Sequence, residues 1–300
     1  MLAKLKIYWE IMRPFTLLAP TVGFISGGLI AIGASSRVAP TSVHLYPIIL
    51  GAISALFLNA ASNVVNQYFD IGIDRINKPN RPLPSGRISL KESRLLSILL
   101  YSFSFFLAYL VPNKQFITIV LITALITYAY SAPPLRTKRW VIPANLTIAI
   151  PRGCLLIVAG WTAVRSFYDF EPWFIGSIFA LYLLGAASTK DFSDIKGDKM
   201  YGCNTLPIIL GAKKAAITIA PFFVLPFLLI PYGKINGMLT GSTIVLYPLT
   251  AILVVWGGYT AYLILRKPEE LTLEANHISW KHMYLMLLVG QIGFALAYLI

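Results

Sequence analysis

Amide and carboxylate side chains recur at helical spacing between residues 59 and 74. Asn59, Asn63, Asn66, Asp70 and Asp74 follow one another at intervals of four, three, four and four. Because an α-helix turns by about 100° per residue, these intervals place all five side chains on one face. The preceding residues are almost wholly apolar, and buried amides or carboxylates are costly unless they are paired or bind a ligand. The pattern predicts an ion-binding site at the end of an apolar helix.

A second group of carboxylates lies further along the chain. Asp191, Asp194 and Asp198 are spaced three and four residues apart, so they also share a helical face, and lysines lie among them. Converging carboxylates repel one another unless they hold protons or bind a cation. Mg²⁺ prefers such oxygen ligands together with substrate phosphate, and Lys and Arg bind phosphate oxygens. The two groups together predict a magnesium and diphosphate site, and an apolar pocket beneath it would suit an isoprenoid chain.

The composition is that of a membrane protein. Hydrophobic residues make up 57% of the 300 residues and charged residues 12%, against about 25% charged in soluble domains. The net charge of +13 could indicate a nucleic-acid partner, but so apolar a chain makes membrane topology the better explanation, and we expect no nucleic-acid binding. We expect residues 1–300 to form a single transmembrane domain.

Apolar segments long enough, or nearly so, to cross a hydrocarbon core of about 30 Å recur along the whole chain. We expect an all-α protein with nine spans, at 15–34, 44–69, 93–111, 116–131, 143–164, 172–189, 215–232, 243–265 and 281–300. The connections on the side of the N-terminus are long and polar, whereas several on the other side are short. Both acidic groups lie at span ends on the N-terminal side, so both could face one pocket.

The basic residues are unevenly distributed between the two sides of the membrane that the nine spans define. Twenty of the 25 Lys and Arg residues fall on the side of the N-terminus. The opposite side has Arg37, Lys114, Arg165 and Lys234, and Arg152 lies inside the fifth span. Because cytoplasmic loops carry an excess of Lys and Arg, we expect a cytoplasmic N-terminus and, with an odd number of spans, a C-terminus outside the cell membrane.

The spacing of the two acidic groups resembles the paired motifs of the UbiA superfamily of intramembrane aromatic and lipid prenyltransferases. Asn66, Asp70 and Asp74 match the first motif, and Asp191 to Asp198 match the second. The resemblance extends to residues 13–17, 77–89, 130–139 and 197–211, so it covers most of the chain. Gln67 departs from the pattern, since many members carry Asp at that position.

The resemblance implies nine helices around a central cavity, with a cytoplasmic-side active site. It also implies two Mg²⁺ ions and a prenyl diphosphate donor. The implied metal ligands are Asn66, Asp70, Asp74, Asp191, Asp194 and Asp198, and the five carboxylates among them are the implied catalytic residues. The candidates for binding the donor diphosphate and its prenyl group are Lys78, Arg81, Tyr130, Arg136, Lys138 and Lys190, with Arg139 as a substitute for Lys138.

The expected reaction is Mg²⁺-dependent transfer of a prenyl group to an aromatic or lipid acceptor within the membrane. Residues 74–89 and 197–211 look most like the branches that act on glyceryl phosphate or chlorophyll. A cation-coupled transporter is the alternative, with both acidic groups as ion ligands. Transporters usually place such groups near the bilayer midplane, which favours the enzyme. Arg152 could reach the diphosphate, pair with a motif carboxylate, or extend along the cavity wall.

Single-cysteine variants test the expected orientation. Arg87→Cys should be protected from a membrane-impermeant thiol reagent in intact cells, because residue 87 is expected in the cytoplasm, whereas Lys234→Cys should be labelled. Labelling of residue 87 from outside would overturn this topology.

Overall fold

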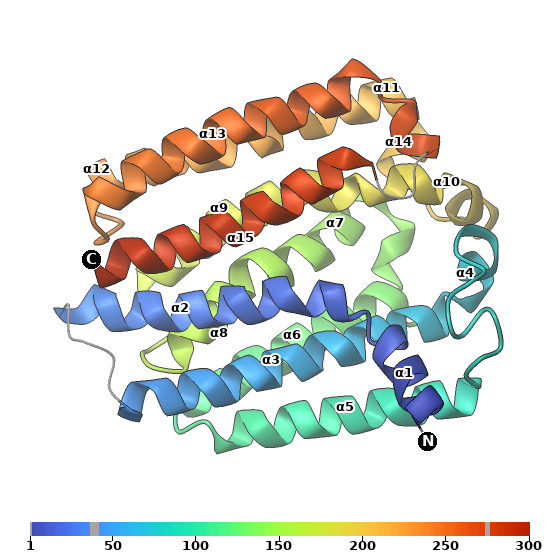
Figure 1. Cartoon of the computed structure of the whole chain (residues 1–300), viewed down its shortest axis with the longest axis horizontal. Helices are drawn as coiled ribbons and strands as arrows, with labels where there is room; N and C mark the ends of the chain where they lie inside the picture. Colours follow the sequence, from blue (N-terminus) through green and yellow to red (C-terminus); the bar gives the residue numbers. More distant parts are fainter. Residues whose placement is uncertain (1, 37–41, 274–276) are drawn as a thin grey trace.

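The structure is a computed structural model that describes residues 2–36, 42–273 and 277–300. Throughout these ranges the chain consists of helices and the turns between them, with no β-strand (Figure 1). The expected all-α architecture is thus confirmed for the described chain. Arg37, which we expected on the side opposite the N-terminus, lies outside these ranges.

Nine segments of the described chain are helical, long and apolar enough to cross a membrane, as the sequence predicts. They are Pro14–Ala34, Leu45–Phe69, Leu90–Leu110, Lys114–Ser131, Val141–Thr162, Phe170–Ser188, Leu206–Ile235, Thr243–Arg266 and Ile278–Leu299. Eight of them agree with the predicted bounds to within three residues. The chain is therefore a multi-pass membrane protein.

The seventh span begins nine residues earlier than predicted, at Leu206. Lys213 and Lys214 suggested a loop, but they lie within α11 (Leu206–Ile219). Gly211 has a backbone φ of 74° inside α11, so the helix bends there instead of ending. Prolines break the second half of the span into short 3₁₀ turns before α12 (Leu229–Ile235). The long helical run is therefore bent in several places.

The remaining spans are each built from one α-helix, the first after an initial 3₁₀ turn at Pro14–Leu17, and one span is an exception. The elements are α2 (Leu18–Ser36), α3 (Ser42–Phe69), α5 (Leu90–Leu110), α6 (Lys114–Ser131), α9 (Phe170–Ser188), α13 (Thr243–Arg266) and α15 (Ile278–Leu299). The fifth span is the exception, because a π-helical turn, Ile150–Leu155, separates α7 (Val141–Ala149) from α8 (Leu156–Thr162). In the bundle α2 packs between α3, α8 and α15, and α5 packs along α3 (Figure 1).

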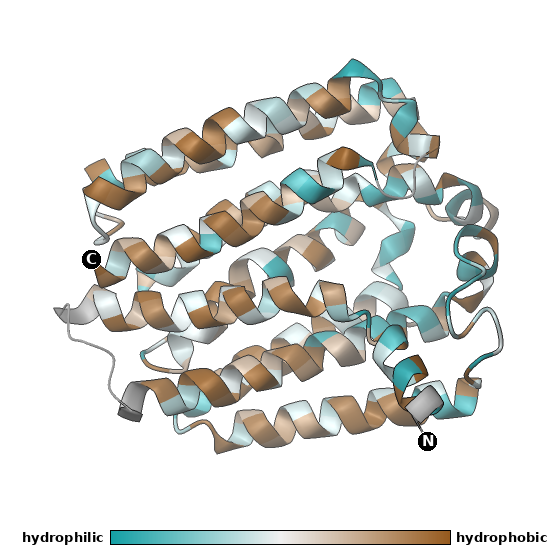
Figure 2. Cartoon of the chain, viewed as in Figure 1, coloured by the Kyte–Doolittle hydropathy of each residue, from teal (hydrophilic) through white to brown (hydrophobic). Residues whose placement is uncertain are grey.

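Hydrophilic residues gather at one end of the bundle (Figure 2). Three short helices lie at that end: α4 (Ile71–Asn77), α10 (Lys190–Met200) and α14 (Glu270–Leu273). Both acidic groups of the sequence lie there, on α3–α4 and on α10. The polar connections expected from the sequence therefore contain helices of their own, which hold the acidic side chains on ordered backbone.

Two asparagines of the polar stripe have structural partners. Asn63 Nδ2 on α3 donates to the Met12 carbonyl at 2.9 Å and to Thr16 Oγ1 at 2.9 Å. Asn59 Nδ2 donates to the Thr16 carbonyl at 3.0 Å. These amides satisfy carbonyls at the break between α1 (Leu2–Ile11) and α2, where the helical hydrogen bonds end. Asn59 and Asn63 therefore use their amide nitrogens to hold the break between α1 and α2 against α3.

Close helix contact at a glycine supplies a stability test. A Cβ atom added to Gly257 of α13 would lie 1.9 Å from the Phe223 carbonyl oxygen, whereas one added to the neighbouring Gly258 would meet no atom within 4 Å. We expect Gly257→Ala to destabilise the protein by about 1–3 kcal/mol through overpacking. Gly258→Ala is the matched control and should be neutral or slightly stabilising, because Ala favours helix. Thermal unfolding in detergent measures both, and equal melting temperatures would contradict this packing.

Candidate active site

The two acidic groups meet around one cavity at the hydrophilic end of the bundle. The first group lies where α3 passes into α4, and the second lies on α10, which packs against α4. All five motif carboxylates line this space, which we call the polar cavity: Asp70, Asp74, Asp191, Asp194 and Asp198. The structure thus brings together the residues that the sequence singled out, although their role as metal ligands stays a prediction.

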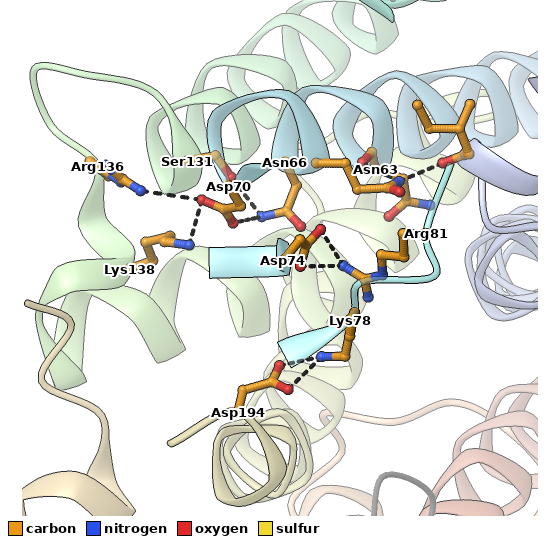
Figure 3. A network of polar contacts seen from close by, with 12 residues as sticks. Asn63, Asn66, Asp70, Asp74, Lys78, Arg81, Ser131, Arg136, Lys138 and Asp194 are labelled. Atoms are coloured by element: carbon orange, nitrogen blue, oxygen red, sulfur yellow. Dashed lines mark hydrogen bonds and ion pairs between the residues drawn. The ribbon is translucent and has the colours of Figure 1, made fainter. Parts of the chain in front are cut away.

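Asp70 lies at the junction of α3 and α4 and is 5% exposed. Asn66 Nδ2 donates to its Oδ2 at 2.7 Å, and Lys138 Nζ lies 2.5 Å from its Oδ1 (Figure 3). Arg136 Nη2 approaches the same oxygen at 3.4 Å. Burial raises the pKa of Asp70, and the charge of Lys138 opposes that rise. The carboxylate is therefore held among basic groups and one amide.

Asp74 and Asp194 each accept two contacts from one basic side chain. Arg81 Nη1 donates to both Asp74 oxygens at 2.8 and 2.7 Å, and Lys78 Nζ lies 2.5 Å from both Asp194 oxygens (Figure 3). The Lys78–Asp194 pair connects the first motif's helix to the second. Three of the five carboxylates are thus neutralised by side chains that we expected to bind diphosphate.

Asp191 and Asp198 differ from the other three, because neither has an ion-pair partner among the described residues. Burial, followed by repulsion from Asp198 and Asp194, raises the pKa of Asp191 well above its usual range. Burial is also the main reason that the pKa of Asp198 rises to about 6. A neighbouring cation would stabilise both charged forms. The second motif therefore has two carboxyl groups without a basic partner on its side of the cavity.

Asn77 connects the two motifs through the backbone and was not predicted as a site residue. Its Nδ2 donates to the Asp194 carbonyl at 2.9 Å, and its Oδ1 accepts from Gly197 N–H at 2.9 Å. A Cβ atom at position 197 would lie 2.6 Å from the Asn77 amide, so only glycine allows this approach. The sequence feature that could have identified Asn77 is its position one helical turn after Asp74, at the end of the helix that carries the first motif.

Three other basic side chains of the polar cavity have no ion pair within the described chain: Arg13, Arg152 and Lys190. Burial lowers the pKa of Arg13 to about 10, so it stays charged at neutral pH. Burial also lowers the pKa of Lys190 well below its usual range, and its Nζ lies 4.8 Å from the Trp280 ring centroid. Arg13 was missed as a site residue, although it directly precedes the first apolar span.

The remaining candidates divide into those that line the polar cavity and those that do not. Tyr130 and Lys138 line it, as do Lys78, Arg81 and Lys190. Arg136 reaches Asp70 but is not part of the lining, and Arg139, considered as a substitute for Lys138, is absent from it. Gln67, the departure from the family motif, donates to the Ile11 carbonyl at 2.6 Å and so supports α1 instead of the cavity.

Two apolar cavities adjoin the polar cavity. One lies among α2, α3, α6 and α8 and shares Ser62, Thr127 and Arg152 with it; we call this the α3–α6 cavity. The other lies among α2, α9 and α15 and also borders the polar cavity at Arg152 and Lys190; we call this the α9–α15 cavity. The site therefore combines one polar cavity with two apolar cavities, which is what binding two lipid-like molecules would require.

Substitution of Asn77 tests the connection between the motifs. Asn77→Ala removes two hydrogen bonds, each contributing about 0.5–1.5 kcal/mol, so we expect a modest loss of thermal stability and a larger loss of turnover. Asn80→Ala is the control, because Asn80 is exposed and contributes only its carbonyl, which the substitution keeps. Parent-like turnover and stability of Asn77→Ala would show that the motifs are aligned without it.

Known proteins resemble this chain along nearly its whole length. The chain is 32% identical over 294 residues to a digeranylgeranylglyceryl phosphate synthase of Methanobrevibacter smithii, covering 96% of each protein. A second protein of that name, from Methanosphaera stadtmanae, is 32% identical over 291 residues, covering 96% of this chain and 98% of the relative.

Solved structures share the fold. A structure of digeranylgeranylglyceryl phosphate synthase superposes with a TM-score of 0.72 at 29% identity, covering 99% of both chains. A UbiA homologue from Archaeoglobus fulgidus, bound to GPP and Mg²⁺, superposes with a TM-score of 0.76 at 21% identity, covering 98% of this chain and 99% of that one. The sequence model of the UbiA prenyltransferase family matches residues 24–288. The chain therefore belongs to the UbiA prenyltransferase family.

Proposed function

We propose that this prenyltransferase moves a prenyl group from a prenyl diphosphate to the hydroxyl of a prenylated glyceryl phosphate. The observation that carries the reaction is the single polar cavity, in which five carboxylates and a set of basic residues adjoin two apolar cavities. The choice of acceptor is supported by relatives along nearly the whole chain, which are named for digeranylgeranylglyceryl phosphate.

The donor set of the polar cavity fits Mg²⁺. No three His, Cys, Asp or Glu side chains in the described chain are close enough to hold one metal ion by themselves. Mg²⁺ does not need such a cage, since it usually takes one or two carboxylates plus substrate phosphate and keeps several waters. The Asn66 amide already donates to Asp70, which leaves its Oδ1 available as a ligand. When bound, Mg²⁺ would neutralise the negative charge that grows on the leaving diphosphate.

We assign one ion to each motif, giving two in all. One ion would take ligands from among Asn66, Asp70 and Asp74, and the other would take one or two of Asp191, Asp194 and Asp198, with phosphate and water completing each set. Support comes from the placement of the first set along the junction of α3 and α4 and of the second set on α10, with both sets lining one cavity. Asp191 and Asp198 have no basic partner in the described chain, which makes the second side a favourable place for a cation.

The basic side chains would exchange partners when the donor binds. Lys78 and Arg81 contact Asp194 and Asp74 in this structure, and a diphosphate would offer them the same kind of acceptor oxygen. Lys138 and Arg136 stand in the same relation to Asp70. Each base then stabilises the charge that develops as the donor's C1–O bond breaks. The diphosphate leaves with the electron pair of the C1–O bond, the acceptor oxygen bonds to C1, and the hydroxyl proton passes to the leaving diphosphate.

The donor's prenyl chain would occupy the α3–α6 cavity. That cavity opens from the polar cavity and is lined mainly by apolar side chains, among them Phe24, Leu58 and Phe116. Tyr130 lies in the polar cavity, where its ring face could stabilise an allylic cation. Apolar walls also exclude water, which would otherwise hydrolyse the activated donor.

We also propose that the site faces the cytoplasm. The support is the distribution of charge, because the polar cavity lies at the same end as most Lys and Arg residues. Acidic groups gathered at one end of the bundle are unlike the midplane ion sites of transporters, and membership of a prenyltransferase family leaves the transporter alternative without support.

Two substitutions of Arg81 test the exchange of partners. Arg81→Ala should weaken donor binding by about 2–5 kcal/mol, because it removes charge-assisted hydrogen bonds in a desolvated site. Arg81→Lys should recover only part of this, since the fork of two parallel donors is lost. Donor affinity and turnover are measured at fixed Mg²⁺. An Arg81→Ala protein that binds and turns over donor like the parent would show that the loop only connects two helices.

An acceptor panel tests the reaction itself. Purified protein is incubated with labelled geranylgeranyl diphosphate, Mg²⁺, and either a geranylgeranylglyceryl phosphate or an aromatic acceptor. We expect product only with the glyceryl phosphate, complete loss with EDTA and recovery with added Mg²⁺. Asp70→Ala and Asp194→Ala should lose nearly all turnover while remaining folded by size-exclusion chromatography. Product with the aromatic acceptor alone would overturn the assignment of acceptor, and full activity of either variant would overturn the site.

A further inference from the structure

Two basic side chains lie at the border between the polar cavity and the α9–α15 cavity. Arg152 and Lys190 line both spaces, and among the described residues no other basic side chain and no acidic side chain lines the α9–α15 cavity. Arg13, the third basic residue without an ion pair in the described chain, lines the polar cavity only. The border therefore has two basic side chains that form no ion pair with the motif carboxylates.

The surroundings of these two side chains make an anion the expected partner. The α9–α15 cavity is otherwise lined largely by apolar residues, such as Leu183, Met283 and Leu287. A cation beside apolar walls is costly unless an anion pairs with it. The Lys190 ammonium rests against the Trp280 ring, which is a weaker partner than a phosphate oxygen. A phosphate that reaches this border would therefore meet basic groups that no carboxylate already pairs with.

A third polar group in the same cavity also lacks a partner. Gln291 is 1% exposed and lines the α9–α15 cavity, and its Oε1 atom makes no hydrogen bond in the described structure. Buried polar atoms are nearly always paired, so an unpaired one at a cavity wall points to a polar ligand group or a water beside it. Because Oε1 accepts hydrogen bonds, the group that pairs with it has to be a donor, such as a water or a hydroxyl of the bound lipid.

The backbone holds Arg152 at the meeting point of all three cavities. Arg152 lies on the π-helical turn Ile150–Leu155 and lines the polar, α3–α6 and α9–α15 cavities. The neighbouring Gly153 packs on the backbone of α9, which leaves the turn little room to shift. π-Helical turns often occur at functional sites. An anion bound by Arg152 would lie next to the point where the donor's chain leaves the polar cavity.

We propose that Arg152 and Lys190 bind the phosphate of the acceptor, whose prenyl chain lies in the α9–α15 cavity. The assignment rests on the proposed function, which gives the reaction two phosphate-bearing substrates. The donor diphosphate, with its Mg²⁺, belongs to the carboxylate side of the polar cavity, and the acceptor's phosphate monoester to the side with unpaired bases. The two lipid chains then leave the centre in different directions, and the acceptor hydroxyl lies between them.

Kinetics with two matched acceptors test this assignment. The acceptors are geranylgeranylglyceryl phosphate and its dephosphorylated counterpart, each varied at saturating donor. Arg152→Gln and Lys190→Gln should each lower kcat/KM for the phosphorylated acceptor by about 10- to 150-fold, the usual range for a hydrogen bond to a charged group. With the dephosphorylated acceptor both should match the parent, because the interaction is already absent. The KM for the donor should stay close to that of the parent.

Two further variants complete the comparison. Arg152→Lys keeps the charge and should recover part of the loss, which a purely structural role would not explain. Arg94→Gln is the matched control, since Arg94 is exposed and lines none of the three cavities, and it should behave as the parent. Equal losses with both acceptors, or a change confined to the donor KM, would overturn the assignment.

A binding measurement separates this inference from the proposed function. Thermal unfolding is followed in EDTA without donor, with the phosphorylated or the dephosphorylated lipid. The parent should be stabilised by the phosphorylated lipid only, and Arg152→Gln and Lys190→Gln should lose that stabilisation. Stabilisation without turnover would overturn the proposed reaction while supporting the phosphate site. Turnover of the phosphorylated acceptor with unchanged stabilisation in both variants would overturn the site alone.

Discussion

Buried charge has to be neutralised, and this constraint organises the end of the bundle where the site lies. Asp70 and Asp74 are 5% and 4% exposed, at the border of a helix whose preceding residues are apolar. Each is matched by a base from a different segment: Arg81 from the loop after α4, and Lys138 from the connection between α6 and α7. Removing one partner of such a pair typically costs several kcal/mol, because the other charge stays buried.

The same pairs decide which segments of the chain meet. Lys78 joins α4 to α10 through Asp194, and Asn77 adds two hydrogen bonds to the backbone of α10 beside it. Segments more than a hundred residues apart are thereby held around one cavity. Because the contacts are made by groups that can also bind phosphate or Mg²⁺, the interactions that shape the cavity are the ones that a substrate would replace.

Much of this arrangement could be predicted from the sequence because it depends on spacing. The intervals between Asp70 and Asp74, and among the three later aspartates, place them on helix faces, and apolar length predicts the spans. The functions of Gln67 and Asn59 could not be predicted, since both donate to carbonyls of a distant segment, which periodicity does not describe. Asn77 was missed for the same reason, because its partners lie on another helix.

The misplaced start of the seventh span has a different cause. Lys213 and Lys214 are typical of a loop when considered locally, but the helix bends at Gly211 and continues past them. Hydropathy records the polarity of a residue and not the direction of the backbone, so a bend and an end look alike in the sequence. Arg13 was missed because a basic residue before the first span is also what membrane topology alone would produce.

The π-helical turn at Ile150–Leu155 has a consequence for how this chain tolerates insertions and deletions. A π turn contains one more residue than an α turn, so it is equivalent to a single-residue insertion in an otherwise regular helix. Every residue after it is rotated by about 100° relative to an uninterrupted α-helix. Deleting one residue there would therefore turn α8 about its own axis, presenting a different face to α2 although every other side chain were kept. Residue count in this turn is thus as much a part of the site as residue identity.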